Sequence, residues 1–201
     1  MYTANVYVVP IFVFMENIIN RYLAKFDEIN VIAQTHLDGL TVDEAQETIR
    51  SIMIDGWEEG FAAVGYSLSD RLDRVFDAAL LSAALTEIIG GETTDERVAR
   101  HVLNGDYSAL GNVAETEFHR MYILGGDHRA QEIDRERPLG KYWLTVRDPK
   151  VRDTHRYIDG ISLPLDGIYY TFDGDYASAP GLFQKVENNA RCRCILGYVY
   201  L

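Results

Sequence analysis

The sequence has very little cysteine: of its 201 residues only Cys192 and Cys194 are cysteines. Because a single residue separates them, a disulfide between the two would be strained. We therefore expect no disulfide framework of the kind that stabilises small secreted proteins. Basic residues are also few, with 19 Lys and Arg against 31 Asp and Glu and a formal net charge of −12. This balance argues against a general nucleic-acid-binding protein.

The charge is unevenly distributed along the chain. Residues 1–90 carry a net charge of −9, whereas residues 119–156 hold nine basic and six acidic residues, net +3. Any weak contact with DNA is therefore expected from residues 119–156, because phosphate attracts basic segments.

Long hydrophobic runs are absent as well. Residues 1–15 contain no charged residue, but the apolar run 6–15 is too short to span a bilayer and is broken by Pro10. It lacks the basic region and cleavage site of a signal peptide, so we expect no membrane association. We interpret residues 1–15 as an apolar arm, a strand or extended segment that covers part of the core. The alternative is that Met15 is the natural start.

Apolar residues at helical spacing predict a helical N-terminal region over residues 1–107. The expected helices cover 15–36, 41–66, 68–89 and a short segment that follows Thr93. Thr41 with Glu44, and Thr93 with Glu96, have the spacing of capping boxes. The third of these helices would bury Leu72, Val75 and Phe76, among others, and end at Gly90-Gly91.

Two glycines lie four residues apart inside the second predicted helix, at positions 56 and 60. Glycine lowers helix propensity, so its presence there needs a reason. We interpret the pair as a site of close approach by another helix, and a hinge is the alternative.

The second half of the chain predicts a change of architecture. A helix is expected over 108–124, interrupted at Gly125-Gly126 and resumed over 127–135. Strands are expected at 142–146, 168–172 and 191–200, where aromatic and β-branched residues gather. We predict an α+β fold, a helical N-terminal region followed by a small sheet-containing C-terminal unit. The aromatic residues of this unit are expected to build its core rather than to stack on nucleobases; they are Tyr157, Tyr169, Tyr170, Phe172, Tyr198 and Tyr200.

Three residues that follow the first predicted strand carry chemistry. Asp148 precedes Pro149, as an N-cap precedes a first helical turn. In a helix that starts there, Asp148, Arg152 and His155 would share one face. An acid, a guanidinium and an imidazole on one face could form an acid–base site, but they are also typical of a buried structural network. We favour the structural interpretation.

The C-terminal pattern resembles the phage Mu F-like minor head proteins, also called the phage head morphogenesis domain. The resemblance covers roughly residues 110–201, and we place the domain at 108–201. The matching positions are Trp143, Asp148, Arg152, His155, Asp159-Gly160, Pro180 and Cys192-Arg193-Cys194, with Thr116-Glu117 and Arg120 upstream. Many members have Asn where this chain has Arg191.

The resemblance implies a virion structural protein rather than an enzyme. The implied location is the capsid interior or portal region, the implied partners are the portal and major capsid proteins, and the implied role is head morphogenesis or DNA packaging. Some proteins with this domain resemble modular toxins in which a toxin module follows it. Because this sequence ends seven residues after Cys194, we expect no such module here. The alternative function is a small nuclease or toxin that uses His155 as acid–base, Arg152 to hold a phosphate and Asp148 beside them.

A metal ion is the one cofactor that the residues suggest. His155, Cys192 and Cys194 are the ligand types that zinc prefers. The set is one ligand short unless Asp148, Asp159 or His128 joins it, and two buried cysteines beside a structural histidine are the simpler interpretation.

The sequence also makes a geometric prediction. If strands 142–146 and 191–200 share a sheet, the helix between them should bring His155 into contact with Cys192 or Cys194, with an Asp148–Arg152 pair beside it. Arg152→Ala would then cost about 3 kcal/mol or more if the pair is buried and under about 1 kcal/mol if it is exposed. Upstream, Glu115, Glu117, His119 and Arg120 are expected to form a solvated helix face.

Overall fold

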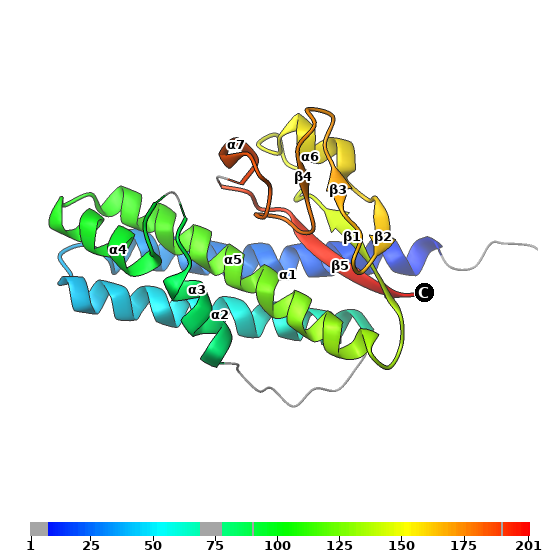
Figure 1. The fold of residues 1–201 in the computed structure, drawn as a ribbon, viewed down its shortest axis with the longest axis horizontal. Helices are drawn as coiled ribbons and strands as arrows, with labels where there is room; N and C mark the ends of the chain where they lie inside the picture. Colours follow the sequence, from blue (N-terminus) through cyan, green and yellow to red (C-terminus); the bar gives the residue numbers. More distant parts are fainter. Residues whose placement is uncertain (1–7, 69–77, 90, 190) are drawn as a thin grey trace, which may run out of the picture.

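The computed structural model describes residues 8–68, 78–89, 91–189 and 191–201 (Figure 1). It confirms the α+β prediction, with a helical N-terminal region followed by a small antiparallel sheet. The helices are α1 (Val8–Thr35), α2 (Val42–Leu68), α3 (Ala78–Thr86), α4 (Thr94–Leu103), α5 (Tyr107–Asp134), α6 (Asp153–Ile158) and α7 (Val186–Asn189). The strands are β1 (Leu139–Leu144), β2 (Ser162–Pro164), β3 (Tyr169–Tyr170), β4 (Tyr176–Ala177) and β5 (Ile195–Tyr200).

The first helix begins earlier than predicted. Because α1 starts at Val8, the expectation of a strand or extended arm is wrong for residues 8–15, while residues 1–7 lie outside the described residues. Pro10 falls in the first turn of α1, where a missing N–H breaks no helical hydrogen bond, so it does not end the helix. None of the helices in the described ranges is long and apolar enough to cross a membrane.

Both predicted capping boxes are confirmed. At the start of α2, the Thr41 backbone N–H donates to Glu44 Oε2 at 2.9 Å, and the Glu44 N–H donates to Thr41 Oγ1 at 3.4 Å. Thr93 and Glu96 make the same reciprocal pair at the start of α4. The predicted helix 68–89 is observed only as α3, since residues 69–77, which include Leu72, Val75 and Phe76, and Gly90 lie outside the described residues.

Helices α1, α2 and α5 lie side by side along the long axis of the molecule (Figure 1). A Cβ added at Gly56 would lie 2.5 Å from the Phe118 carbonyl oxygen, and one added at Gly60 would lie 1.9 Å from that of Tyr122. Both distances are shorter than any van der Waals contact, so α2 and α5 touch through their backbones. The interpretation of Gly56 and Gly60 as a site of close helix approach is confirmed.

The predicted interruption of α5 at Gly125-Gly126 is wrong, because α5 is continuous from Tyr107 to Asp134. Gly125 serves packing instead: a Cβ there would lie 2.1 Å from the Trp57 carbonyl oxygen. A glycine pair in a helical pattern thus marks either an end or a close contact, and here tertiary packing decides.

The small sheet has the order β2-β1-β5 with both pairings antiparallel, and β3 and β4 form a separate two-stranded ribbon. The predicted strand 191–200 starts too early. Arg191 adopts φ 53, and the Cys192 N–H donates to the Asn189 carbonyl in a turn, so both cysteines precede β5. Likewise 142–146 is shifted to 139–144, because Arg147 has φ 55 and the Thr145 N–H donates to Asp159 Oδ1. The predicted strand 168–172 shortens to β3, and β2 and β4 were not predicted.

One hydrophobic core joins the helices to the sheet. Buried residues of α1, α2 and α5, such as Tyr22, Trp57 and Phe118, form one cluster with Trp143 of β1 and Ile195 of β5. Strand β5 packs on α1, α2 and α5. The segment 191–194 that precedes β5 therefore lies next to α5, where Cys192 and His119 line one small hollow. The division of the chain at residues 107 and 108 stays a prediction.

Candidate functional site

His155, Cys192 and Cys194 meet in the interior, which confirms the contact predicted between them. His155 Nδ1 lies 3.3 Å from Cys194 Sγ and 3.7 Å from Cys192 Sγ. The three residues are 1%, 4% and 2% exposed. His155 comes from α6 and the cysteines from the turn before β5, so the pairing of β1 with β5 brings the two segments together.

Aromatic side chains enclose the imidazole of His155. Phe183 stacks on it with ring centroids 5.1 Å apart, and Trp143 meets it edge-on at 5.6 Å. The His155 Nε2 atom has no hydrogen-bond partner within the part of the chain that the structure describes. The ring is therefore held by packing, with Nδ1 directed at the two sulfur atoms.

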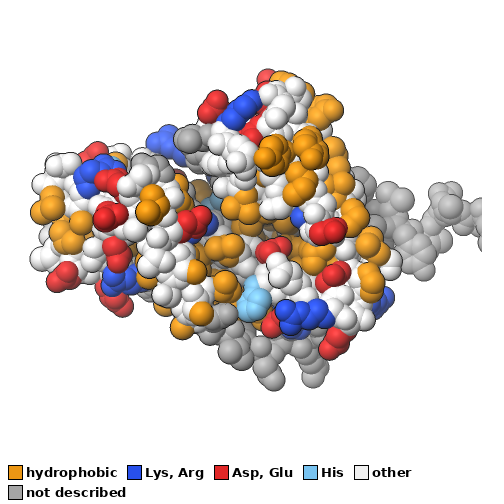
Figure 2. Space-filling model, in the orientation of Figure 1, with side chains coloured by type: hydrophobic (Ala, Val, Ile, Leu, Met, Phe, Trp, Pro, Cys, Tyr) orange, Lys and Arg blue, Asp and Glu red, His pale blue; other side chains and the backbone are white. Residues whose placement is uncertain are grey.

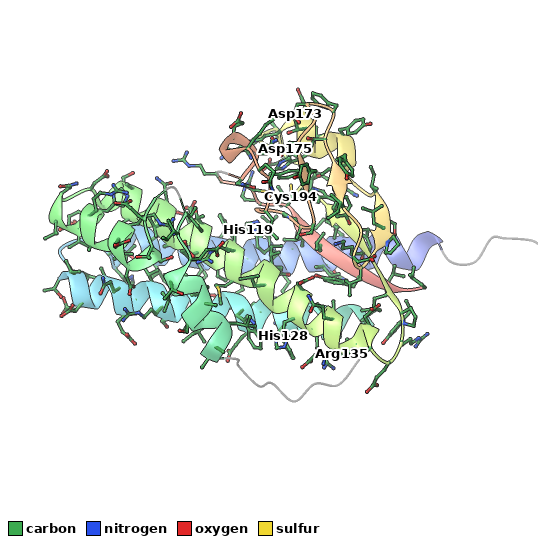
Figure 3. The ribbon with its side chains drawn as sticks, viewed as in Figure 1. His119, His128, Arg135, Asp173, Asp175 and Cys194 are labelled. Atoms are coloured by element: carbon green, nitrogen blue, oxygen red, sulfur yellow. The ribbon has the colours of Figure 1, made fainter. Side chains whose placement is uncertain are left out.

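A second histidine, His119 of α5, reaches the same cluster. It is 5% exposed, its Nδ1 lies 2.9 Å from the Tyr22 hydroxyl, and its Nε2 has no hydrogen-bond partner among the described residues. His119 and Cys192 line one small hollow. Figure 3 shows His119 on α5 beneath the loop that carries Cys194. The expectation that His119 and Glu117 belong to a solvated helix face is wrong, since Glu117 is 0% exposed.

The two thiols differ in their electrostatic surroundings. The neighbouring Cys194 thiol is the largest cause that lowers the pKa of Cys192, and the nearby imidazoles of His119 and His155 lower it further, although burial acts in the opposite direction. The pKa of Cys194 is raised by its neighbour Cys192 and by burial. The cluster thus favours a thiolate at Cys192, and the thiolate is the form that binds metals.

None of the three residues suggested from the sequence as a fourth ligand is placed for that role. Asp148 accepts a hydrogen bond from Arg193 at 2.6 Å, and Asp159 accepts one from the Thr145 N–H at 2.8 Å. His128 lies farther along α5, 5.8 Å from the Trp57 ring (Figure 3). His119 was not expected beside the cysteines, because it lies on a helix that no pattern along the sequence connects to them.

The predicted helical face of Asp148, Arg152 and His155 is wrong. Helix α6 begins at Asp153 with Arg152 as its N-cap residue. Asp148 instead closes a separate turn, in which its carboxylate accepts from the Lys150 N–H at 2.9 Å. Proline at position 149 is compatible both with a turn and with a first helical turn, so the sequence alone did not distinguish the observed turn from the predicted helix start. His155 is buried among aromatic rings, so the three residues do not form the open acid–base site of the nuclease hypothesis.

The partner of Asp148 is Arg193, the central residue of the Cys-Arg-Cys segment, rather than Arg152 as predicted. Their side chains are 33% and 22% exposed. We expect Arg193→Ala to lower the free energy of unfolding by about 1 kcal/mol, because the pair is partly exposed. Asp148 keeps its Arg193 partner in Arg152→Ala, so that substitution should not strand the carboxylate. Urea denaturation of both variants measures the difference. Equal stability of Arg193→Ala and the parent would contradict this assignment.

The upstream residues Glu117 and Arg120 belong to a buried ion-pair network. The Glu117 carboxylate accepts from Arg97 at 2.6 Å and from Arg120 Nε at 2.8 Å. Arg120 also donates to Glu87 at 2.7 Å and to the Ala84 carbonyl at 2.9 Å. The network therefore joins α4, α5 and the end of α3.

The remaining motif residues shape the backbone. Gly160 has φ 78, a conformation that favours glycine, and its N–H donates to the Trp143 carbonyl at 2.8 Å. Pro180 is buried in the loop between β4 and α7. Both residues position the segments around His155 rather than supplying reactive groups.

Asp175, which the sequence analysis did not single out, organises the loop that follows β4. Its carboxylate is 2% exposed and accepts from Asn188 Nδ2 at 2.7 Å and from the N–H groups of Gln184 and Lys185 at 3.1 and 3.2 Å. Asn188 in turn accepts a hydrogen bond from Thr154 of α6 (3.0 Å). Through Asn188, Asp175 thus ties the loop that carries Phe183 to the helix that carries His155.

This arrangement predicts sensitivity to acid. Burial raises the pKa of Asp175, but hydrogen bonds from Asn188 and from backbone N–H groups outweigh burial and leave the pKa below its ordinary value. A lowered folded-state pKa contributes stability above the unfolded-state pKa, and this stability is lost as the pH falls through the folded value. Below about pH 4, wild-type stability should therefore fall more steeply than that of Asp175→Asn. Denaturation curves between neutral and acidic pH provide the measurement, and parallel pH profiles would contradict the prediction.

The fold and the cluster together define an α+β protein whose C-terminal unit is built around a buried His-Cys-Cys centre. Part of the chain is similar to the minor head protein GP7 of Bacillus phage SPP1, with 30% identity over 86 residues. The match covers 43% of this chain and only 28% of that protein. No protein-family profile matches the chain, and no solved structure matches it.

Proposed function

We propose that this protein is a minor head protein of a phage or prophage, a structural component of the virion that assists head morphogenesis or DNA packaging near the portal. The observation that carries the proposal is the 30% identity to a protein named as a minor head protein. Residues 108–201, which bear the Mu F-like pattern, would form the head morphogenesis domain. The portal and major capsid proteins are the proposed partners.

The chemistry of the site supports a structural role over the nuclease alternative. His155 is 1% exposed, and its Nδ1 is directed at two sulfur atoms rather than toward solvent. A general acid–base must reach a proton of the substrate, which this imidazole does not do.

Exposed aromatic residues of the C-terminal unit supply a surface for such a partner. Contrary to the expectation that they build the core, Tyr157, Tyr170 and Phe172 are 60%, 64% and 61% exposed. Figure 2 shows apolar side chains gathered over this part of the molecule. Tyrosine and phenylalanine are enriched in protein–protein interfaces, so this aromatic surface, defined by Tyr157, Tyr170 and Phe172, is the proposed contact with a head protein.

DNA contact through residues 119–156 stays a prediction, and ion pairs reduce the positive charge available for it. Arg120, Arg129, Arg147 and Arg156 each lie within 3.3 Å of a carboxylate oxygen. Paired guanidinium groups offer less attraction to phosphate than free ones. The proposal therefore assigns the main contacts to protein partners.

Co-purification with the portal and major capsid proteins encoded beside this chain tests the proposal. We expect one of them to be retained, and the chain to be present in purified particles. Tyr170→Ser combined with Phe172→Ser should weaken retention, whereas Leu103→Ser, at a 78% exposed position on α4, should not. Failure of both partners to co-purify, together with absence from particles, would refute the proposed function.

A further inference from the structure

We propose that His119, His155, Cys192 and Cys194 hold one zinc ion in a tetrahedral site with two sulfur and two nitrogen ligands. The site lies between α5, α6 and the turn before β5. It would be a structural site, because all four protein ligands leave no open position for a substrate or water.

The spacing of the donor atoms carries the first part of the argument. One donor atom each from His155, Cys192 and Cys194 lies within 4.8 Å of the other two. Zinc bonds of about 2.3 Å to sulfur and about 2.0 Å to nitrogen place tetrahedral donors about 3.3 to 3.8 Å apart, with about 3.5 Å for a nitrogen and a sulfur. The observed Nδ1 to Sγ distances of 3.3 and 3.7 Å are close to that range.

His119 would complete the set as the fourth ligand. It would have to move toward the other three, because the donor atoms that already lie within 4.8 Å of one another belong to His155, Cys192 and Cys194. The His119 Nε2 is buried and has no hydrogen-bond partner in the described ranges, and burying an imidazole nitrogen without a partner costs free energy. The other nitrogen, Nδ1, lies 2.9 Å from the Tyr22 hydroxyl. A metal-bound histidine commonly donates its second N–H to such an acceptor, which fixes the tautomer and the ring orientation. Tyr22 would therefore act as a positioning residue for His119.

The ligand types select the metal. Two thiolates would be costly to bury alone, but zinc neutralises their combined charge. Soft sulfur ligands with imidazole select zinc over magnesium and calcium. The proposed ligand set contains no carboxylate, which also distinguishes this site from the oxygen-rich sites that calcium prefers.

The site would add a metal link between α5 and the C-terminal unit, beside the hydrogen bond that Arg191 donates to Asn112 of α5 at 2.9 Å. His119 belongs to the long helix α5, whereas the other three ligands belong to the C-terminal unit. A metal bound by all four would fasten that unit to the helices.

The test is the metal content of the full chain, purified without chelators and measured by elemental analysis. We expect about one zinc ion per chain. Cobalt(II) exchanged into the protein should give the visible absorption of a tetrahedral site and a thiolate-to-cobalt charge-transfer band. Removal of zinc with a chelator should lower the thermal unfolding temperature, and added zinc should restore it.

Variants distinguish the ligands from their neighbours. Cys192→Ser and His119→Ala should lose zinc or bind it at least tenfold more weakly, whereas the matched control His128→Ala on the same helix should retain it. Because a ligand variant can fail to fold, the wild-type stoichiometry and the cobalt spectrum decide independently of the variants. Wild-type protein that neither contains zinc nor binds added zinc or cobalt, with two titratable free thiols, would overturn the site. Unchanged zinc affinity in folded His119→Ala would overturn the assignment of the fourth ligand.

Discussion

Replacing Gly60 by alanine is expected to destabilise the protein by about 3 kcal/mol or more, because the two central helices must separate to admit one methyl group. The Cβ would lie 1.9 Å from the carbonyl oxygen of Tyr122 and 2.7 Å from its carbonyl carbon. Both obstacles are backbone atoms of α5, which cannot rotate away as a side chain can. Alanine would improve helix propensity by about 1 kcal/mol, and this gain is too small to offset the clash.

Gly111→Ala is the matched control for Gly60→Ala. It makes the same chemical change inside a helix, but its Cβ would lie 3.5 Å from the Ala33 Cβ and 3.8 Å from the Ala33 carbonyl oxygen, which are ordinary contacts. We expect Gly111→Ala to leave the free energy of unfolding unchanged or to raise it by up to about 1 kcal/mol. Urea denaturation of the two variants compares them directly. Similar stabilities for both would show that α2 and α5 do not touch through their backbones.

Glu117→Ala is the second substitution expected to have a large effect, about 3 to 5 kcal/mol of lost stability. Glu117 is 0% exposed, and its two partners Arg97 and Arg120 have side-chain exposures of only 14% and 10%. Removing the carboxylate would leave two guanidinium groups close together in a poorly solvated site. Glu117→Gln keeps the shape but not the charge, so its effect should lie between those of alanine and the parent.

The control for Glu117→Ala is Glu92→Ala. Glu92 also pairs with an arginine, Arg100 at 2.8 Å, but the two side chains are 34% and 44% exposed. Water can replace the lost partner there, so the effect should be much smaller. Thermal and chemical denaturation measure both variants, and comparable losses would contradict the view that burial makes the Glu117 network costly to break.

The predictions that succeeded depend on local chemistry. The capping boxes at Thr41 and Thr93 require only residues three apart, and the glycine spacing in α2 follows from one helix. The contact of His155 with the cysteines also held, because it follows from antiparallel pairing of the strands on either side. In each case a short-range rule or a single pairing was sufficient.

The predictions that failed required knowledge of tertiary partners. The sequence predicted that Asp148 caps a helix and shares one of its faces with Arg152. In the structure, the Asp148 carboxylate instead accepts a hydrogen bond from Arg193, which is distant in sequence. His119 and Glu117 were expected on a solvated helix face, but in the structure both side chains are buried by tertiary packing. The φ of 53 at Arg191, which delays β5, has no sequence signal, because arginine does not favour that conformation.

The pairing of β1 with β5 has a kinetic consequence. Leu144 pairs with Ile195, so residues 145–194 form one long closed loop that is held at its base by these two strands. Bringing such distant segments together loses chain entropy before any contact compensates for it, and contacts of this separation slow folding. The helix-capped segments can order early, whereas the histidine–cysteine cluster assembles only when β5 has joined β1. For the same reason, we expect separation of this strand pair in the native protein to open the loop, the aromatic rings around His155 and the cluster together as one cooperative unit.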